Sequence, residues 1–162
     1  MSDRVTAWFE LAPNIECKEQ ILMDIIQEKC PELVTTSKAN RRLTESGFYT
    51  FIEDEGLPGY AGIFIWNSNG TIYEPSKEST RLRKFIKKVV NIFGVNEVWY
   101  VSELSMDSIE IIADPYEDFD YDWKPLVKKK STELKRMYEM QLRGENCWPE
   151  NITFLHDDFW DI

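Results

Sequence analysis

Runs of β-branched and aromatic residues along the chain predict the strands of a sheet. The first run, RVTAWFEL, occupies 4–11, and two more lie at 47–52 and 60–66, joined by a connection that contains glycine and proline. An Asn-Gly turn and a third short apolar run follow, so this region is predicted to form an antiparallel meander. Two later runs, at 96–104 and 107–114, predict a strand pair that extends the same sheet.

Apolar residues at helical spacing predict three helices. Asn14 can cap the first helix, and Pro31 ends it. Ser76 can cap the second, and Gly94 supplies the left-handed residue that ends it. The third is predicted to extend from Pro125 to Arg143, with a glycine directly after it. The second helix has the clearest pattern, and its apolar residues share one arc that is predicted to face the core: Leu82, Phe85, Ile86, Val89 and Phe93.

The length and the absence of a linker indicate one domain. The chain has 162 residues, enough for one core and short for two, and no repeat or low-complexity stretch divides it. The polar stretch 33–45 has no period and is predicted to be a loop, while the apolar tail 145–162 is expected to dock on the body. The prediction is therefore a single α+β domain over residues 1–162, with an antiparallel-rich sheet of about five to six strands and three principal helices.

Acidic residues outnumber basic ones, and the two signs are unevenly distributed. The net charge is −10, yet segments 77–88 and 124–136 together hold +10, so the rest of the chain holds −20. An acidic surface repels nucleic acid and anionic membranes at long range and speeds encounter with basic proteins. A basic protein is therefore the expected partner, and a nucleic acid or a membrane is not.

Targeting and redox signals point to the cytoplasm. No apolar run approaches the roughly 20 residues that span a bilayer, and the first residues lack the pattern of a signal peptide. The three cysteines, Cys17, Cys30 and Cys147, are odd in number and widely spaced. They are therefore expected to be reduced thiols rather than a disulfide framework or a metal site.

The residues that could carry catalysis do not form a recognisable motif. The only histidine, His156, is followed by two aspartates, but adjacent residues in a strand or turn point to different sides, which is poor geometry for a dyad. A surface or structural histidine is expected instead. Cys17 has no base near it in sequence, and the glycines of EGLPGYAG do not have the spacing of a phosphate-binding loop. We therefore expect no catalytic residue, no metal and no cofactor.

A basic stripe on the second predicted helix could bind phosphates. Its members recur at helical spacing beside the apolar arc: Lys77, Arg81, Lys84 and Lys88. No aromatic residues alternate with them, as base stacking would require. The stripe is therefore predicted to be a solvated face of the helix.

Acidic and aromatic residues alternate in DPYEDFDYDW at 114–123, and similar mixtures occur at 51–56 and at the end of the chain. An extended segment with this period of two places rings on one face and carboxylates on the other. The rings can belong to the core while the acids meet water, or the segment can meet a basic partner. The three segments could form one face, whose candidate partner-binding residues are Glu117, Asp118, Asp120, Trp123, Asp157, Asp158, Trp160 and Asp161.

In composition the chain resembles the immunity proteins that neutralise bacterial nuclease toxins. That resemblance implies stoichiometric blockade of a basic active site rather than catalysis. A phage anti-defence protein that mimics DNA is a related possibility, although two basic helices fit it less well. The alternative from another class is a small-ligand-binding domain or an enzyme, with a pocket among Tyr60, Trp66 and Trp99.

Overall fold

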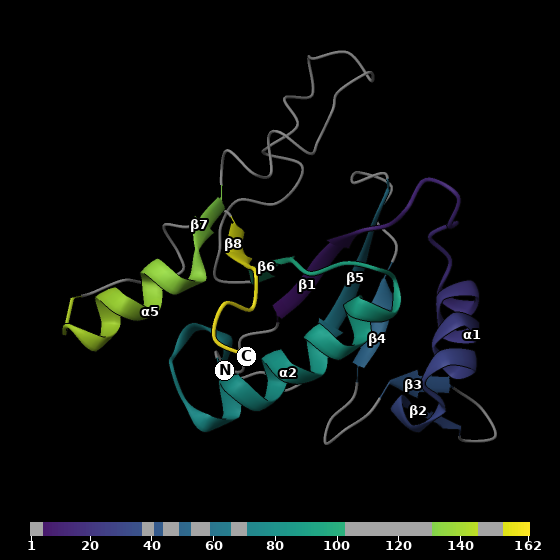
Figure 1. Ribbon diagram of the computed structural model, residues 1–162, viewed down its shortest axis with the longest axis horizontal. Coiled ribbons are helices and arrows are strands. Elements are labelled where there is room, and N and C mark those ends of the chain that lie inside the picture. The colour runs from purple at the N-terminus through teal and green to yellow at the C-terminus, as the bar shows by residue number, and fades with distance from the viewer. Residues whose placement is uncertain are drawn as a thin grey trace, which may run out of the picture.

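A mixed sheet with helices packed against one face is the frame of the computed structural model (Figure 1). The structure describes residues 5–36, 41–43, 49–52, 59–65, 71–102, 131–145 and 154–162. The strand predicted at 107–114 and the Asn-Gly turn that follows the meander lie outside these residues. In Figure 1 the long helix α2 crosses in front of the sheet, and α1 and α5 lie on either side of it.

Eight strands of the described residues form the sheet, and five of them have four residues or more. Every neighbouring pair is antiparallel except β7 and β8, which are parallel. The strands lie in the order β2 (Val34–Thr36), β3 (Arg41–Leu43), β4 (Tyr49–Ile52), β5 (Tyr60–Ile65), β1 (Val5–Glu10), β6 (Val98–Ser102), β8 (Phe154–Asp157) and β7 (Ser131–Glu133). The antiparallel-rich α+β prediction is confirmed.

Alternation along β1 divides the sheet into two faces. Ala7 and Phe9 belong to the core that the helices cover, and their partners on β5 in the register are also apolar. Trp8 lies between them and therefore points to the other face, where its register partner on β6 is Trp99. Both tryptophans are buried.

Three helices lie within the described residues: α1 (Glu19–Lys29), α2 (Lys77–Ile92) and α5 (Leu134–Leu142). Helix α2 begins as predicted, because Oγ of Ser76 accepts a hydrogen bond from the main-chain N–H of Ser79 at 3.1 Å. It ends before Gly94, whose φ of 74° is the left-handed conformation that glycine tolerates. The predicted apolar arc is buried throughout: Leu82, Phe85, Ile86, Val89 and Phe93.

The first helix begins later than predicted. Asn14 does not cap it; helix α1 starts at Glu19 after Lys18. The preceding residues instead form hydrogen bonds at the start of β5. The N–H of Leu11 donates to the carbonyl of Gly59 at 2.8 Å, and Cys17 Sγ donates to the carbonyl of Tyr60 at 3.2 Å. These non-local bonds outweigh the local capping signal.

The predicted loop at 33–45 contains the short strands β2 and β3. Their register pairs Val34 with Leu43, and both side chains are buried, which explains why this polar stretch forms a strand pair. The third run of the meander is not a strand but a 3-10 turn, η2 (Thr71–Tyr73).

The last helix is shorter than predicted. It begins at Leu134, directly after β7, so its predicted extension back to Pro125 is wrong for 131–133. Residue Pro125 itself lies outside the described residues. The apolar tail docks as expected, since Phe154, Leu155 and Phe159 are buried. No helix in the described ranges has the length and apolar character needed to cross a membrane.

Candidate functional site

The end of the chain folds back on α2 after β8. At Phe159 the backbone takes a φ of 57°, which reverses the chain and places the ring in the core. Its N–H donates to Asp157 Oδ1 at 2.9 Å, and the N–H of Ile162 donates to the carbonyl of Phe159 at 3.2 Å. Lys87 of α2 donates to the main-chain oxygen of Ile162. The segment 157–162 is therefore held as one tight turn.

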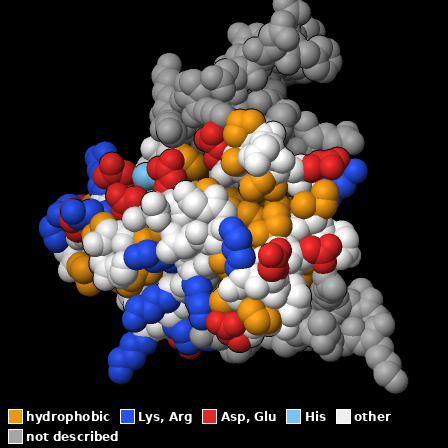
Figure 2. Space-filling model, turned by 45° about the vertical axis from the view of Figure 1, so that its right-hand side comes forward, with side chains coloured by type: hydrophobic (Ala, Val, Ile, Leu, Met, Phe, Trp, Pro, Cys, Tyr) orange, Lys and Arg blue, Asp and Glu red, His pale blue; other side chains and the backbone are white. Residues whose placement is uncertain are grey.

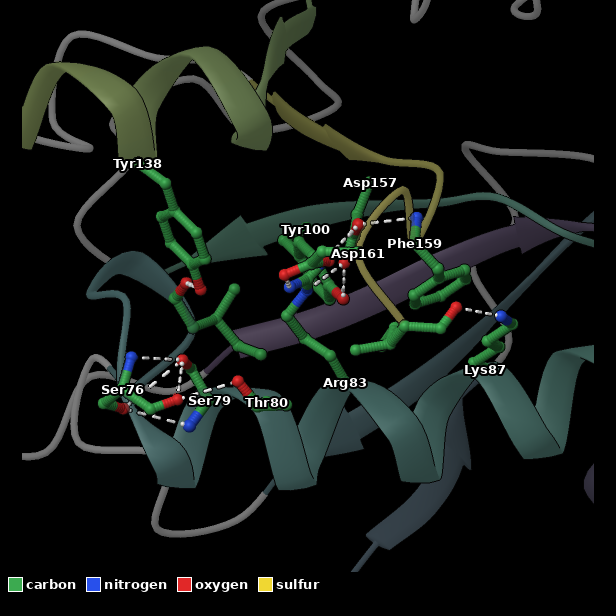
Figure 3. A network of polar contacts seen from close by, with 12 residues as sticks. Ser76, Ser79, Thr80, Arg83, Lys87, Tyr100, Tyr138, Asp157, Phe159 and Asp161 are labelled. Atoms are coloured by element: carbon green, nitrogen blue, oxygen red, sulfur yellow. Dashed lines mark hydrogen bonds and ion pairs between the residues drawn. The ribbon is translucent and has the colours of Figure 1, made fainter. Parts of the chain in front are cut away.

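A buried arginine of α2 is the centre of this contact (Figure 3). Arg83 has no exposed surface, and it binds Asp157 through two hydrogen bonds of 2.8 Å, from Nε to Oδ2 and from Nη2 to Oδ1. It also binds Asp161, with Nη1 at 3.1 Å from Oδ2 and Nη2 at 2.9 Å from Oδ1. One guanidinium thus joins two carboxylates that lie four residues apart, in the bidentate geometry that suits arginine.

Aromatic side chains surround the arginine. The hydroxyl of Tyr100 donates to Asp157 Oδ2 at 2.7 Å. The guanidinium carbon lies 4.4 Å from the ring centroid of Trp160 and 5.6 Å from that of Tyr138, so the cation packs on both rings. Tyr138 in turn contacts Trp160 edge-on and donates its hydroxyl proton to the carbonyl of Ile72 at 2.5 Å. Each polar group named here therefore has a partner inside the protein.

Burial and ion pairing shift the pKa values of this network. Burial alone lowers the pKa of Arg83, but the hydrogen bonds that it donates to Asp157 and Asp161 outweigh this effect and raise the pKa above its usual value. Burial, together with the nearby Asp157, raises the pKa of Tyr100 well above its usual value. Burial also raises the pKa of Tyr138 to about 12. One guanidinium thus faces two carboxylates, and of these only Asp161 has exposed surface.

Four of the predicted partner-binding residues are described by the structure, and they differ in burial. Asp157 is buried with 0% exposure, so the expectation of an accessible carboxylate is wrong for this residue; its ion pair with Arg83 takes it into the interior. Asp158 is exposed, the side chain of Asp161 is 39% exposed and Trp160 is half-buried. We call these three residues the terminal surface. The remaining candidates lie outside the described residues: Glu117, Asp118, Asp120 and Trp123.

Arg83 is part of the site although the predicted site residues did not include it. A signal was present, because Arg83 falls on the buried arc of α2, four residues after Ser79 and three before Ile86. The neighbouring basic stripe is exposed throughout, as predicted: Lys77, Arg81, Lys84 and Lys88.

The histidine lies on the other face of the sheet. His156 Nε2 is 2.9 Å from Glu97 Oε2, and the imidazole packs on Trp99 with ring centroids 5.2 Å apart. Its carboxylate partner is therefore Glu97 and neither of the aspartates that follow it. Figure 2 shows the pale-blue histidine beside acidic side chains at the surface. Within the described ranges, no group of three or more His, Cys, Asp or Glu side chains is placed to hold a metal ion.

Both described cysteines are free thiols, and the environment of Cys30 makes it a poor nucleophile. Cys17 and Cys30 are reduced thiols, as expected, and Cys147 lies outside the described residues. Burial raises the pKa of the Cys30 thiol, and its hydrogen bond to Glu32 at 2.9 Å acts in the same direction. A raised pKa keeps the thiol protonated, which disfavours covalent chemistry.

The contacts of Arg83 connect helix α2 to the end of the chain through Asp157 and Asp161. Comparisons of the chain with protein-family models, with curated proteins and with solved structures found no match.

Proposed function

We propose that this chain is an acidic protein-binding module of the cytoplasm, an immunity-type inhibitor that blocks a basic partner such as a nuclease toxin. The observation that supports this proposal is the terminal surface, where the exposed Asp158 and the partly exposed Asp161 and Trp160 lie within four residues of the chain. Aromatic anchors commonly supply the binding energy of an interface, and charges at its rim steer the partner. The net charge of −10 adds long-range attraction for a basic protein.

A charge reversal tests the proposal. The purified chain is used to capture partners from cells of its source, and association rates with the captured protein are measured for the parent and for Asp158→Lys. The exposed Asp158 makes the substitution compatible with folding. We expect Asp158→Lys to slow association, and we expect the difference to shrink as the screening length falls from about 10 Å at 0.1 M salt to about 3 Å at 1 M.

Glu28→Lys is the matched control. Glu28 is exposed on α1, which packs near β2 and β4, far across the sheet from β8. It changes the net charge by the same amount but leaves the terminal surface intact. Equal association rates for the two variants would show that only total charge matters, and the acidic-surface proposal would then be abandoned.

One observation favours the second candidate, a small-ligand-binding domain. Trp99 is completely buried and contacts Tyr60 edge-on, with ring centroids 6.0 Å apart. Within the part of the chain that the structure describes, Trp99 Nε1 has no hydrogen-bond acceptor, which is unusual for a buried indole. Trp66, the third residue of the predicted pocket, lies outside that part. A small molecule retained in native mass spectrometry, with no protein captured, would favour this candidate.

A further inference from the structure

The turn at Phe159 requires contacts that hold it. A φ of 57° lies in the left-handed region, which bulky L residues rarely adopt, and Phe159 is also buried. Such a backbone conformation costs free energy and persists only where the surrounding structure determines it. The fold must therefore supply contacts that keep residues 157–162 in this shape.

Arg83 supplies contacts on both sides of the turn. Before Phe159 it binds Asp157 through two hydrogen bonds of 2.8 Å. After Phe159 it packs under the ring of Trp160 at 4.4 Å and binds Asp161 at 2.9 and 3.1 Å. Figure 3 shows its side chain reaching from α2 to the two aspartates. A single rigid guanidinium thus links the start and the end of the turn.

The other residues that hold the turn contact at most one residue of the terminal surface. Lys87 binds only the main-chain oxygen of Ile162, and Tyr138 contacts Trp160 at the ring edge. Among the described residues that hold the turn, Arg83 contacts both Trp160 and Asp161. It does so from the interior, since it has no exposed surface, and it leaves the outer side of Asp161 accessible.

We propose that Arg83 is the positioning residue of the terminal surface: it holds the inner sides of Trp160 and Asp161, so that their outer sides are presented in one geometry before a partner arrives. This inference rests on the proposed function, because it concerns the same surface. Groups that are ordered in advance lose less conformational entropy on binding. Affinity for a basic partner therefore depends on Arg83 although Arg83 cannot touch that partner.

Two variants test the role of Arg83. Arg83→Lys keeps the charge but loses the planar fork that bridges two carboxylates. The double variant Arg83→Met with Asp157→Asn removes the buried pair together, so that neither charge is left buried alone and folding is preserved. Lys84→Met is the control, because Lys84 is an exposed neighbour on the same helix. Circular dichroism first establishes that each variant is folded.

Two measurements follow on each folded variant. The first is hydrogen exchange of the main-chain amides of 158–162, which reports local opening of the turn. The second is the affinity, at low salt, for a short synthetic arginine-rich peptide, compared with the same peptide carrying glutamine in place of arginine. For both Arg83 variants we expect faster exchange and peptide binding weaker on the order of tenfold. Lys84→Met should match the parent in both measurements.

The outcomes separate this inference from the proposed function. If the folded Arg83 variants exchange and bind like the parent, Arg83 does not position the surface, while the proposed function is unaffected. If the parent does not prefer the arginine peptide, or Asp158→Lys does not weaken its binding, the proposed function is overturned. Hydrogen exchange alone then decides whether Arg83 orders the turn.

Discussion

Asp157 shows how strongly the environment of one residue can differ from that of its neighbours in sequence. His156 and Asp158 on either side of it are half-buried and exposed, whereas Asp157 is completely buried. Its oxygens accept hydrogen bonds from Arg83, from the hydroxyl of Tyr100 and from the N–H of Phe159. These bonds offset the free-energy cost of removing the carboxylate from water. Without such partners, the buried charge would destabilise the fold.

At this scale we predict that Arg83→Met destabilises the fold by about 3–5 kcal/mol, because it leaves Asp157 as an uncompensated buried charge. Denaturant unfolding measures the loss. Adding Asp157→Asn should restore part of it, since the lone charge is then removed. Lys84→Met, at an exposed position, should stay within about 0.5 kcal/mol of the parent. If Arg83→Met lost no more stability than Lys84→Met, the buried ion pair would be contradicted.

Stability should also fall in strong base because of Tyr138. Burial raises its pKa from the usual 10.0 to about 12, so the unfolded chain releases the phenol proton before the folded protein does. The stability that follows from this difference is complete below pH 10 and is lost as pH rises to 12, on the order of 2–3 kcal/mol. Tyr100 adds a loss of the same sign.

The test compares the parent with Tyr138→Phe by denaturant unfolding across this pH range. Below pH 10 the variant should be less stable by about 1 kcal/mol, because it lacks the hydrogen bond to Ile72. Towards pH 12 the gap should close and then reverse, because only the parent loses the stabilisation of about 2–3 kcal/mol that the raised pKa of Tyr138 contributes, whereas phenylalanine has no proton to lose. A gap that stays constant across the range would contradict the raised pKa.

Helix α2 connects the core to the terminal surface at the scale of an element. One side of it carries the buried apolar arc together with Arg83, and the other carries the exposed basic stripe. Its start is capped by Ser76, and its end is set by Gly94. Since Arg83 is part of the same rigid helix as the core residues, the position of residues 157–162 is tied to the packing of the core.

The apolar arc should therefore dominate the stability of this element. Phe85 is 3% exposed, and Phe85→Ala is expected to cost about 3–5 kcal/mol, because it removes a buried ring and leaves a cavity. Lys84→Ala, at the exposed position directly before Phe85, is the matched control and should change stability by less than about 0.5 kcal/mol. A loss below about 1 kcal/mol for Phe85→Ala in denaturant titration would mean that the arc does not carry the core.

One cluster of buried residues extends through the described part of the molecule. It includes residues of β1, β5, β6 and β8 and of all three described helices. Strands that are distant in sequence share this cluster, since β1 lies between β5 and β6. Elements that depend on one core are expected to unfold together.

We accordingly predict a single cooperative unfolding transition. Tryptophan fluorescence and far-ultraviolet circular dichroism should give the same denaturant midpoint. Limited proteolysis should not release two stable halves, because either half would expose part of the shared cluster. Two midpoints, or two protease-resistant fragments, would show that the chain folds as separate units.

The sequence by itself determined the elements whose causes are local. The cap of α2 at Ser76, its apolar arc and its end at Gly94 were all predictable, because each depends on residues within a few positions of one another. The longer strands β1, β4, β5 and β6 and the docking of the tail followed from apolar runs in the same way. Within the terminal surface, the sequence identified Asp158, Trp160 and Asp161 as candidates by residue type alone.

Only the tertiary structure decided which polar residues are buried and which strands are neighbours. Arg83 and Asp157 are separated by 74 positions, so no local pattern could show that they pair. The late start of α1 likewise depends on a contact with a distant residue, Tyr60. The strands β2 and β3 pair locally, but they bury Val34 and Leu43 in a core that distant elements complete. The free energy of such contacts comes from burial and from hydrogen bonds that exist only once the chain has closed, and it overrides local propensity where the two conflict.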